Sequence, residues 1–80
     1  MKAVILAAGE GVRMRPLTLR TPKPLLQVAG RPLLEHIIYA LPKDINELIV
    51  VIGYLGDQIK NFLGNEYHGL KIQYIWQKRN

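Results

Sequence analysis

A glycine-containing turn directly after a short apolar run constrains this chain more than any other feature. The run is Ala-Val-Ile-Leu at residues 3–6, and the turn is Ala-Ala-Gly-Glu-Gly at residues 7–11. Because Gly9 and Gly11 lack a Cβ, we expect both to adopt positive φ and to bring bare N–H groups close to an anion. Open α/β sheets bind ligands beyond the carboxyl ends of their strands. The pattern therefore predicts a buried strand followed by a phosphate-binding loop.

The excess positive charge of the chain is concentrated in the segment that follows this turn. The formal net charge of the 80 residues is +5. Residues 32–80 hold five cationic and five acidic side chains, whereas residues 9–31 hold Glu10 and five cationic residues, namely Arg13, Arg15, Arg20, Lys23 and Arg31. Such a focal excess suits a compact polyanion such as a nucleoside triphosphate better than nucleic acid, along which Lys and Arg usually spread. Without the glycines, a solvated basic loop would be the favoured interpretation.

Composition excludes several kinds of chemistry. The sequence contains no cysteine and no serine, which rules out serine and cysteine nucleophiles, zinc–thiolate sites and disulfides. Neither His36 nor His68 has a second ligand at metal spacing, so we predict no metal site within this chain. No apolar run approaches the ~18–20 residues of a membrane span, and nothing resembles a signal peptide. We expect a soluble cytoplasmic protein.

Alternating strand and helix patterns predict an α/β fold. Residues 48–52 are continuously apolar, which is typical of a parallel strand buried on both faces, and residues 70–76 alternate in part, which indicates one wetter face. Apolar residues recur at helical spacing in residues 33–41, between Pro32 and Pro42. They do so again in residues 55–63, where Gly64 is expected to end the helix in a left-handed conformation. The proline-rich residues 16–32 are expected to form an ordered excursion.

The order strand, loop, helix, strand, helix, strand predicts part of a doubly wound, Rossmann-like parallel sheet with about three strands and two helices. Right-handed crossovers would pack the helices on its faces. We expect residues 1–80 to form a single partial nucleotide-binding domain. The first strand would then have an unpaired edge, which favours self-association or pairing with a complementing chain.

Two familiar phosphate-binding motifs do not match the turn. The dinucleotide fingerprint requires a third glycine where Met14 stands, and its acidic residue is missing from residues 28–32. The Walker-type loop requires Gly-Lys-Ser/Thr, whereas Gly11 is followed by Val12 and Arg13.

A longer pattern is specific. Residues 1–9, followed by Arg-Met-Arg-Pro-Leu-Thr at 13–18, Pro-Lys-Pro-Leu-Leu at 22–26 and Val-Ala-Gly-Arg-Pro-Leu-Leu at 28–34, resemble the amino-terminal part of the sugar-phosphate nucleotidyltransferases. The resemblance continues to Gln77 and covers essentially the whole chain. It implies transfer of a nucleotidyl group from a nucleoside triphosphate to a sugar-1-phosphate, with release of pyrophosphate and assistance by Mg²⁺. The focal charge and the absence of a long apolar run predict no nucleic acid or membrane partner.

The same resemblance assigns roles to individual residues. Arg13 and Lys23 match the catalytic cations, which would neutralise charge on the phosphates. The nucleotide-binding residues that it implies contribute backbone groups or a base-reading amide; they are Leu6, Ala7, Ala8, Gly9, Gly11 and Gln77.

Members of this family are several times as long as 80 residues, and they carry the Mg²⁺-holding aspartate and the sugar-binding residues beyond the region that this chain resembles. We therefore expect the nucleotide-binding half of a nucleotidyltransferase, either truncated or split, with very low activity in isolation. Two alternatives stay open: a nucleotide- or phosphate-binding module without chemistry of its own, and a truncated piece without function.

Overall fold

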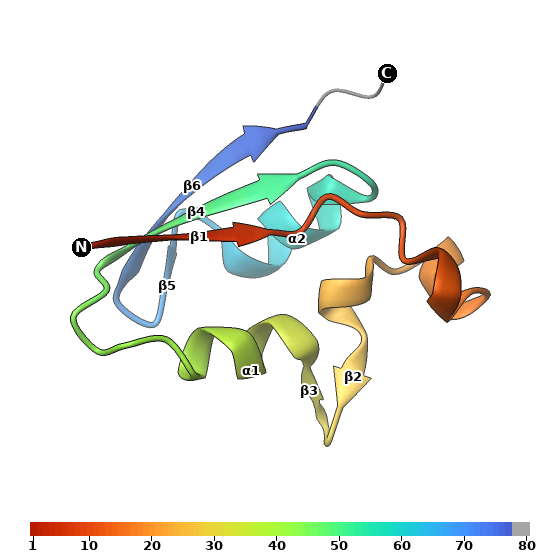
Figure 1. Cartoon of the computed structure of the whole chain (residues 1–80), viewed down its shortest axis with the longest axis horizontal. Coiled ribbons are helices and arrows are strands. Elements are labelled where there is room, and N and C mark those ends of the chain that lie inside the picture. The colour runs from red at the N-terminus through yellow and green to blue at the C-terminus, as the bar shows by residue number, and fades with distance from the viewer. Residues whose placement is uncertain (78–80) are drawn as a thin grey trace.

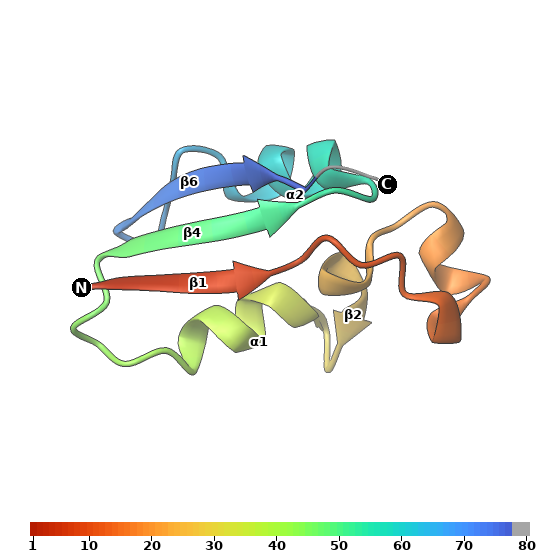
Figure 2. The ribbon, with the colours of Figure 1, turned by 45° about the horizontal axis from the view of Figure 1, so that its top comes forward.

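The computed structural model describes residues 1–77, which form a four-stranded mixed sheet and two helices (Figure 1). The strand order is β1–β4–β6–β5. The strands β1 (Lys2–Leu6), β4 (Glu47–Ile52) and β6 (Leu70–Trp76) are parallel, and the short β5 (Glu66–Tyr67) runs antiparallel to β6. Figure 2 shows the three parallel strands side by side, with their carboxyl ends pointing toward the loop that follows β1. The predicted α/β fold with three parallel strands is confirmed.

Both helices pack on the same face of the sheet. Helix α1 (Leu33–Tyr39) connects β1 to β4, and α2 (Gly56–Leu63) connects β4 to β6. Because the chain moves across the sheet in one direction, two right-handed crossovers place their helices on one side. The helices and strands share one apolar core, made of Ala7, Leu34, Ile38, Leu48, Val50, Ile52, Ile59, Leu63 and Ile72.

The expectation of helices on both faces, and of a central strand buried on both faces, is wrong for the described residues. In β4 the side chains alternate: Leu48 is fully buried, whereas Ile49 and Val51 are only half-buried. On the same face as Ile49 and Val51, the side chains of Val4, Leu6 and Ile75 are 60%, 82% and 53% exposed. The continuous apolar run of β4 therefore reflects a sheet face that neither helix covers.

The helix ends follow the sequence signals closely. Helix α1 begins directly after Pro32 and ends at Tyr39, two residues before the predicted end, because the Leu41 N–H bonds the Ile38 carbonyl in a tighter turn. Helix α2 ends before Gly64, whose φ is 64° and ψ is −153°. The expected left-handed helical conformation is wrong there, although the observed one is equally restricted to glycine.

The segment between β1 and α1, residues 7–32, forms one excursion that includes the ordered excursion predicted for residues 16–32. It contains three short 3₁₀ turns, η1 (Val12–Met14), η2 (Leu17–Leu19) and η3 (Lys23–Leu25). A hairpin of β2 (Gln27–Val28) and β3 (Arg31–Pro32), which the sequence patterns did not indicate, leads into α1. Leu25 packs on the core and the Leu33 N–H donates to the Leu26 carbonyl, so the excursion is anchored where it rejoins the fold.

The free edge of β1, the position of Trp76 and the lengths of the helices complete the description of the fold. Within residues 1–77, β1 pairs only with β4, so its other edge is unpaired as predicted. Trp76 packs beside α2, since a Cβ built on Gly56 would lie 2.8 Å from Trp76 Cζ3. Among these residues, no helix has the length and apolar character needed to cross a membrane.

Candidate nucleotide-binding site

A pocket of about 240 Å³ lies where β1 ends and the excursion begins. It is lined by Leu6, Ala7, Gly9, Gly11, Lys23 and Pro24. Five of the eight site residues predicted from the sequence are therefore brought together at the carboxyl end of a parallel strand. This is the edge of an open α/β sheet at which ligands bind.

Pairing between β1 and β4 continues into the loop and fixes its first residues. The Ala7 N–H donates to the Val51 carbonyl at 2.8 Å, and the Tyr54 N–H donates to the Ala8 carbonyl at 3.4 Å. A Cβ built on Gly53 would lie 3.2 Å from Ala8 Cβ, so the two loops cross closely at this point. Ala8 thus contacts the turn after β4 and does not line the pocket.

The two glycines of the turn differ in conformation. Gly11 has a φ of 63° and a ψ of 42°, and a Cβ there would lie 2.8 Å from Thr18 Cγ2 and 3.3 Å from Lys23 Cβ. Gly9 does not have a positive φ, and a Cβ built on it would meet no atom within 4 Å. The expectation of positive φ is thus confirmed for Gly11 and wrong for Gly9, whose lack of a side chain instead leaves open space beside the pocket.

Lys23 supplies the one positive charge among the residues that line the pocket. It opens η3 between Pro22, which is fully buried, and Pro24, and this brings it beside Gly11 although twelve positions separate the two. Within residues 1–77 no ion pair involves Lys23. Its ammonium group is therefore available to an anion in the pocket.

Arg13 and Gln77 lie outside the pocket lining. Arg13 is exposed on η1, and within the described range no ion pair involves it. The Gln77 N–H donates to the Ile52 carbonyl at 2.7 Å, which continues the pairing of β6 with β4 and keeps Gln77 at the same edge of the sheet. The roles that the resemblance assigns to all eight residues stay predictions.

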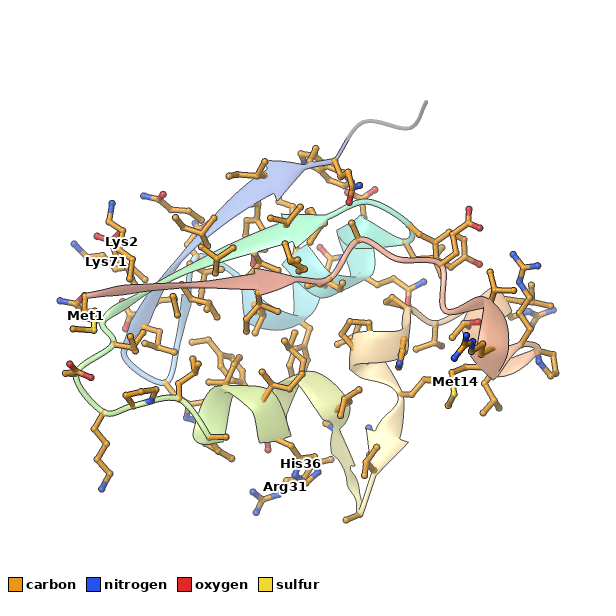
Figure 3. All side chains as sticks on the ribbon, in the orientation of Figure 1. Met1, Lys2, Met14, Arg31, His36 and Lys71 are labelled. Carbon is orange, nitrogen blue, oxygen red and sulfur yellow. The ribbon has the colours of Figure 1, made fainter. Side chains whose placement is uncertain are left out.

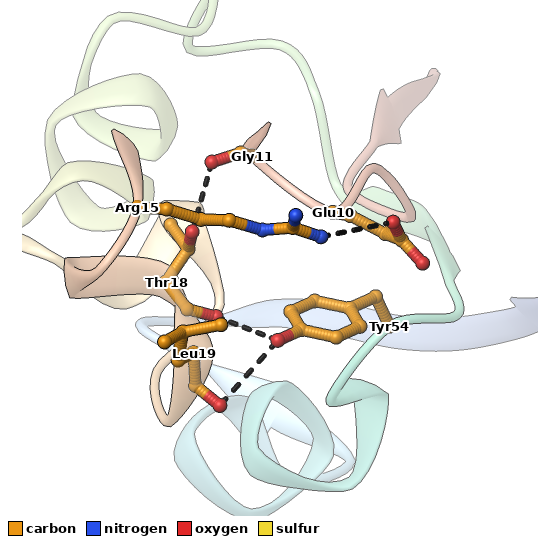
Figure 4. Close-up of polar contacts among 6 residues, drawn as sticks. All are labelled: Glu10, Gly11, Arg15, Thr18, Leu19 and Tyr54. Carbon is orange, nitrogen blue, oxygen red and sulfur yellow. Dashed lines mark hydrogen bonds and ion pairs between the residues drawn. The ribbon is translucent and has the colours of Figure 1, made fainter. Parts of the chain in front are cut away.

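Three residues that sequence reasoning missed hold the excursion in place, and Figure 4 shows two of them, Thr18 and Tyr54. Thr18 is fully buried and its Oγ1 donates to the Gly11 carbonyl at 2.8 Å. Tyr54, in the turn after β4, donates through Oη to the Thr18 carbonyl at 2.8 Å, and Gln58 Nε2 donates to the Arg20 carbonyl at 2.7 Å. Tyr54 follows Gly53 at the carboxyl end of a predicted strand, and that position was the available signal.

The described residues do not fit a magnesium site on their own. The pocket lining includes a lysine and no carboxylate. Glu10, which lies between the lining residues Gly9 and Gly11 in sequence, pairs with Arg15 at 3.5 Å. No group of three or more His, Asp or Glu side chains suited to a metal lies together in residues 1–77.

A raised pKa is found in a different cluster. Burial of Tyr67, and then its 2.5 Å hydrogen bond to Glu35 Oε2, raise the pKa of the Tyr67 hydroxyl to about 12. Arg31 lies 3.7 Å from the other oxygen of Glu35 and stacks over Tyr39 at 5.6 Å. This network connects β3, α1 and β5. None of its side chains lines the pocket after β1, so it supplies no acid or base to the candidate site.

The parallel sheet, the glycine turn at its carboxyl edge and the lysine beside that turn define a Rossmann-like α/β protein. Comparison with known proteins identifies the family, since the family model described as nucleotidyl transferase matches residues 2–80. The chain belongs to the nucleotidyl transferase family.

Individual relatives agree with this assignment. The chain is 49% identical over 76 residues to the N-acetylmuramate alpha-1-phosphate uridylyltransferase of Neisseria meningitidis. The aligned region covers 92% of this chain and 33% of that relative. The chain is similar to the solved structure of the CTP:phosphocholine cytidylyltransferase of Streptococcus pneumoniae, with a TM-score of 0.76 and 47% identity over 92% of this chain and 32% of that one. A UDP-glucose pyrophosphorylase solved with UDP-glucose shares the fold, with a TM-score of 0.84 and 22% identity over 98% of this chain and 35% of that one.

The chain spans only part of these proteins. It covers between 12% and 33% of the lengths of eight curated relatives that it matches. The family is therefore established for this segment alone.

Proposed function

We propose that the pocket after β1 binds a nucleoside triphosphate, and that this chain supplies the nucleotide-binding part of an enzyme that transfers the nucleotidyl group to a sugar-1-phosphate. One observation carries the proposal: in a member of the nucleotidyl transferase family, Lys23 and the glycine turn line the same pocket at the carboxyl edge of the sheet. The concentration of positive charge in residues 9–31 supports it as well.

The chemistry needs charge neutralisation more than covalent assistance. A phosphate oxygen of the sugar-1-phosphate attacks the α-phosphorus of the triphosphate and forms a new P–O bond. The bond from the α-phosphorus to the bridging oxygen breaks, and pyrophosphate leaves with the electron pair. Negative charge then gathers on the α-phosphoryl oxygens and on the leaving group, where the Lys23 ammonium and the Arg13 guanidinium would stabilise it. Backbone without side chains at Gly9 and Gly11 would allow the phosphates to approach closely.

The names of two similar relatives bear on the acceptor. The Neisseria protein, 49% identical, is a uridylyltransferase for a sugar-1-phosphate, and the choline-phosphate cytidylyltransferase of S. pneumoniae is 50% identical over 68 residues. Both acceptors are phosphate monoesters, so attack by a phosphate oxygen is common to them. A sugar-1-phosphate is the acceptor that we propose, and choline phosphate is the alternative that an assay must include.

Titration of the 80-residue chain with UTP, CTP, dTTP, ATP and GTP, followed by NMR, tests the binding step. Lys23→Ala removes a charge in the pocket, and Lys71→Ala removes the same charge at the amino end of β6, remote from the loop that carries Met14 (Figure 3). A charge-assisted hydrogen bond contributes ~1.5–3 kcal/mol, which corresponds to an affinity about 10- to 150-fold weaker for Lys23→Ala. Lys71→Ala should bind like the wild type. Equal losses in the two variants would indicate a general basic surface and contradict the proposal.

Pyrophosphate release, measured with sugar-1-phosphates and with choline phosphate, tests the chemical step. We expect no more than a trace from the 80-residue chain, because the residues lining its pocket include no carboxylate that could hold a metal ion. Robust turnover that Arg13→Ala abolishes would show that the chain assembles a complete site. Turnover with choline phosphate alone would exclude the sugar acceptor.

A further inference from the structure

Tyr54 links two parts of the chain that are far apart in sequence. It lies in the turn between β4 and α2, and its hydroxyl is 2.8 Å from the Thr18 carbonyl and 3.4 Å from the Leu19 carbonyl (Figure 4). Gln58, in the first turns of α2, adds a 2.7 Å bond to the Arg20 carbonyl. Three successive carbonyl groups of the excursion are thus held by side chains from the β4–α2 region.

The contacts lead from Tyr54 to the pocket without Tyr54 lining it. Thr18, whose carbonyl Tyr54 holds, is fully buried and donates through Oγ1 to the Gly11 carbonyl. Its Cγ2 stands 2.8 Å from the position of a Cβ on Gly11, and Lys23 Cβ stands 3.3 Å from the same position. Gly11 and Lys23 both line the pocket. A shift of Thr18 would therefore move a wall of the pocket.

Hydrophobic packing gives this part of the excursion little support. No residue of η1 is buried, and in η2 only Thr18 is. Leu17 and Leu19 are 61% and 55% exposed. Because a segment with few buried apolar contacts opens at low free-energy cost, its hydrogen bonds decide where it rests.

We propose that Tyr54 is a positioning residue for triphosphate binding: through Thr18 it fixes the relative placement of Gly11 and Lys23. Gln58 reinforces it through Arg20. The proposal rests on the proposed function for its ligand, whereas its claim about loop order stands on the contacts alone. Tyr54 itself is not among the residues that line the pocket.

The test compares Tyr54→Phe with Tyr74→Phe. Tyr74 offers a matched control, because its hydroxyl also donates to a backbone carbonyl, that of Gly64, at 2.6 Å, and it lies on β6, which β4 separates from β1 and the loop after it. Removing one hydrogen bond should weaken triphosphate affinity about 2- to 12-fold in Tyr54→Phe and leave it unchanged in Tyr74→Phe. The two variants should unfold at similar denaturant concentrations.

Amide hydrogen exchange gives a second readout. The Met14 and Leu19 N–H groups, which donate to the Gly11 and Pro16 carbonyls, should exchange faster in Tyr54→Phe and not in Tyr74→Phe. Gln58→Met should raise the same exchange rates to a smaller extent, and it serves if Tyr54→Phe does not fold.

The outcomes separate the two proposals. Equal losses of affinity in Tyr54→Phe and Tyr74→Phe, or unchanged exchange of the loop amides in Tyr54→Phe, would overturn the positioning role. If the wild type binds no triphosphate, the proposed function fails, and the exchange comparison still decides whether Tyr54 orders the loop.

Discussion

Replacement of Gly11 by alanine should destabilise the chain through two separable effects. The first is conformational, since Gly11 occupies the left-handed helical region with φ 63° and ψ 42°, which costs an L-residue about 1–2 kcal/mol. The second is steric, because the new Cβ would lie 2.8 Å from Thr18 Cγ2 and 3.3 Å from Lys23 Cβ. Overpacking of this kind costs about 1–3 kcal/mol. Gly11→Ala should therefore lower the free energy of unfolding by about 2–5 kcal/mol, a large share of the ~4–12 kcal/mol expected for 80 residues.

Two further substitutions separate these effects. Thr18→Ser removes Cγ2 and keeps the hydroxyl that donates to the Gly11 carbonyl. In the double variant Gly11→Ala/Thr18→Ser, the steric contribution to the loss of unfolding free energy should therefore fall by about 1–3 kcal/mol. Gly30→Ala is the control for conformation alone, because Gly30 has a φ of 79° and a Cβ there would meet nothing within 4 Å. It should cost about 1–2 kcal/mol.

Urea unfolding, followed by circular dichroism, supplies the free energies for the five proteins of this comparison, including the wild type. If Thr18 Cγ2 blocks the new Cβ, the coupling between Gly11→Ala and Thr18→Ser should be favourable and exceed the ~0.3–0.5 kcal/mol expected of independent sites. Gly11→Ala should also cost more than Gly30→Ala. Additive effects, or equal costs for the two glycines, would show that Thr18 does not close the space above Gly11.

Three other perturbations follow from the same structure. Gly9→Ala should leave the free energy of unfolding within about 0.5 kcal/mol of the wild type, because Gly9 has no positive φ and a Cβ there meets no atom within 4 Å. The same substitution should weaken triphosphate binding measured by NMR. Unchanged affinity would mean that the ligand does not approach Gly9. The pKa of Tyr67 is about 12 in the folded chain against 10.0 for an unperturbed tyrosine, so the folded state holds this proton more tightly. The resulting contribution to the free energy of unfolding is complete below pH 10 and is lost between about pH 10 and 12. The free energy of unfolding of Tyr67→Phe, measured by denaturant unfolding at a series of pH values, should therefore decline less over that range. The free edge of β1 and the exposed side chains of Val4, Leu6 and Ile75 should cause concentration-dependent self-association in light scattering, which Val4→Lys reduces; a sharp monomer at all concentrations would contradict this.

Local sequence signals were sufficient for the elements that make up the sheet. The apolar runs at residues 3–6 and 48–52 are short and contain β-branched residues, a glycine follows each within three positions, and they became β1 and β4. Pro32 and Gly64 marked one end of each helix, because the fixed φ of proline and the freedom of glycine to adopt positive φ both act within a single turn. The glycine turn was predicted at the carboxyl edge of the sheet because it directly follows the apolar run at residues 3–6.

The face covered by the helices was not a local matter. Handedness alone allows a helix on either side, depending on the direction in which the next strand is added, and this direction depends on which strands pair. The pairing order β1–β4–β6 sent both helices to one face and left Ile49 and Val51 half-buried. Hydrophobicity of a strand indicates that both faces avoid water, and does not indicate which residues cover each face.

The sequence by itself determined the strand–loop–helix order, the focal positive charge and the place of the glycine turn after the first strand, because each depends on residues close together in the chain. Tertiary structure decided which residues meet. It brought Lys23 beside Gly11, left Arg13 and Gln77 outside the pocket lining, and connected Tyr54 to Thr18 across 36 positions. The physical reason is that a hydrogen bond from a tyrosine hydroxyl to a backbone carbonyl can use any residue as acceptor, so no residue pattern marks it, and only the path of the folded chain selects the partner.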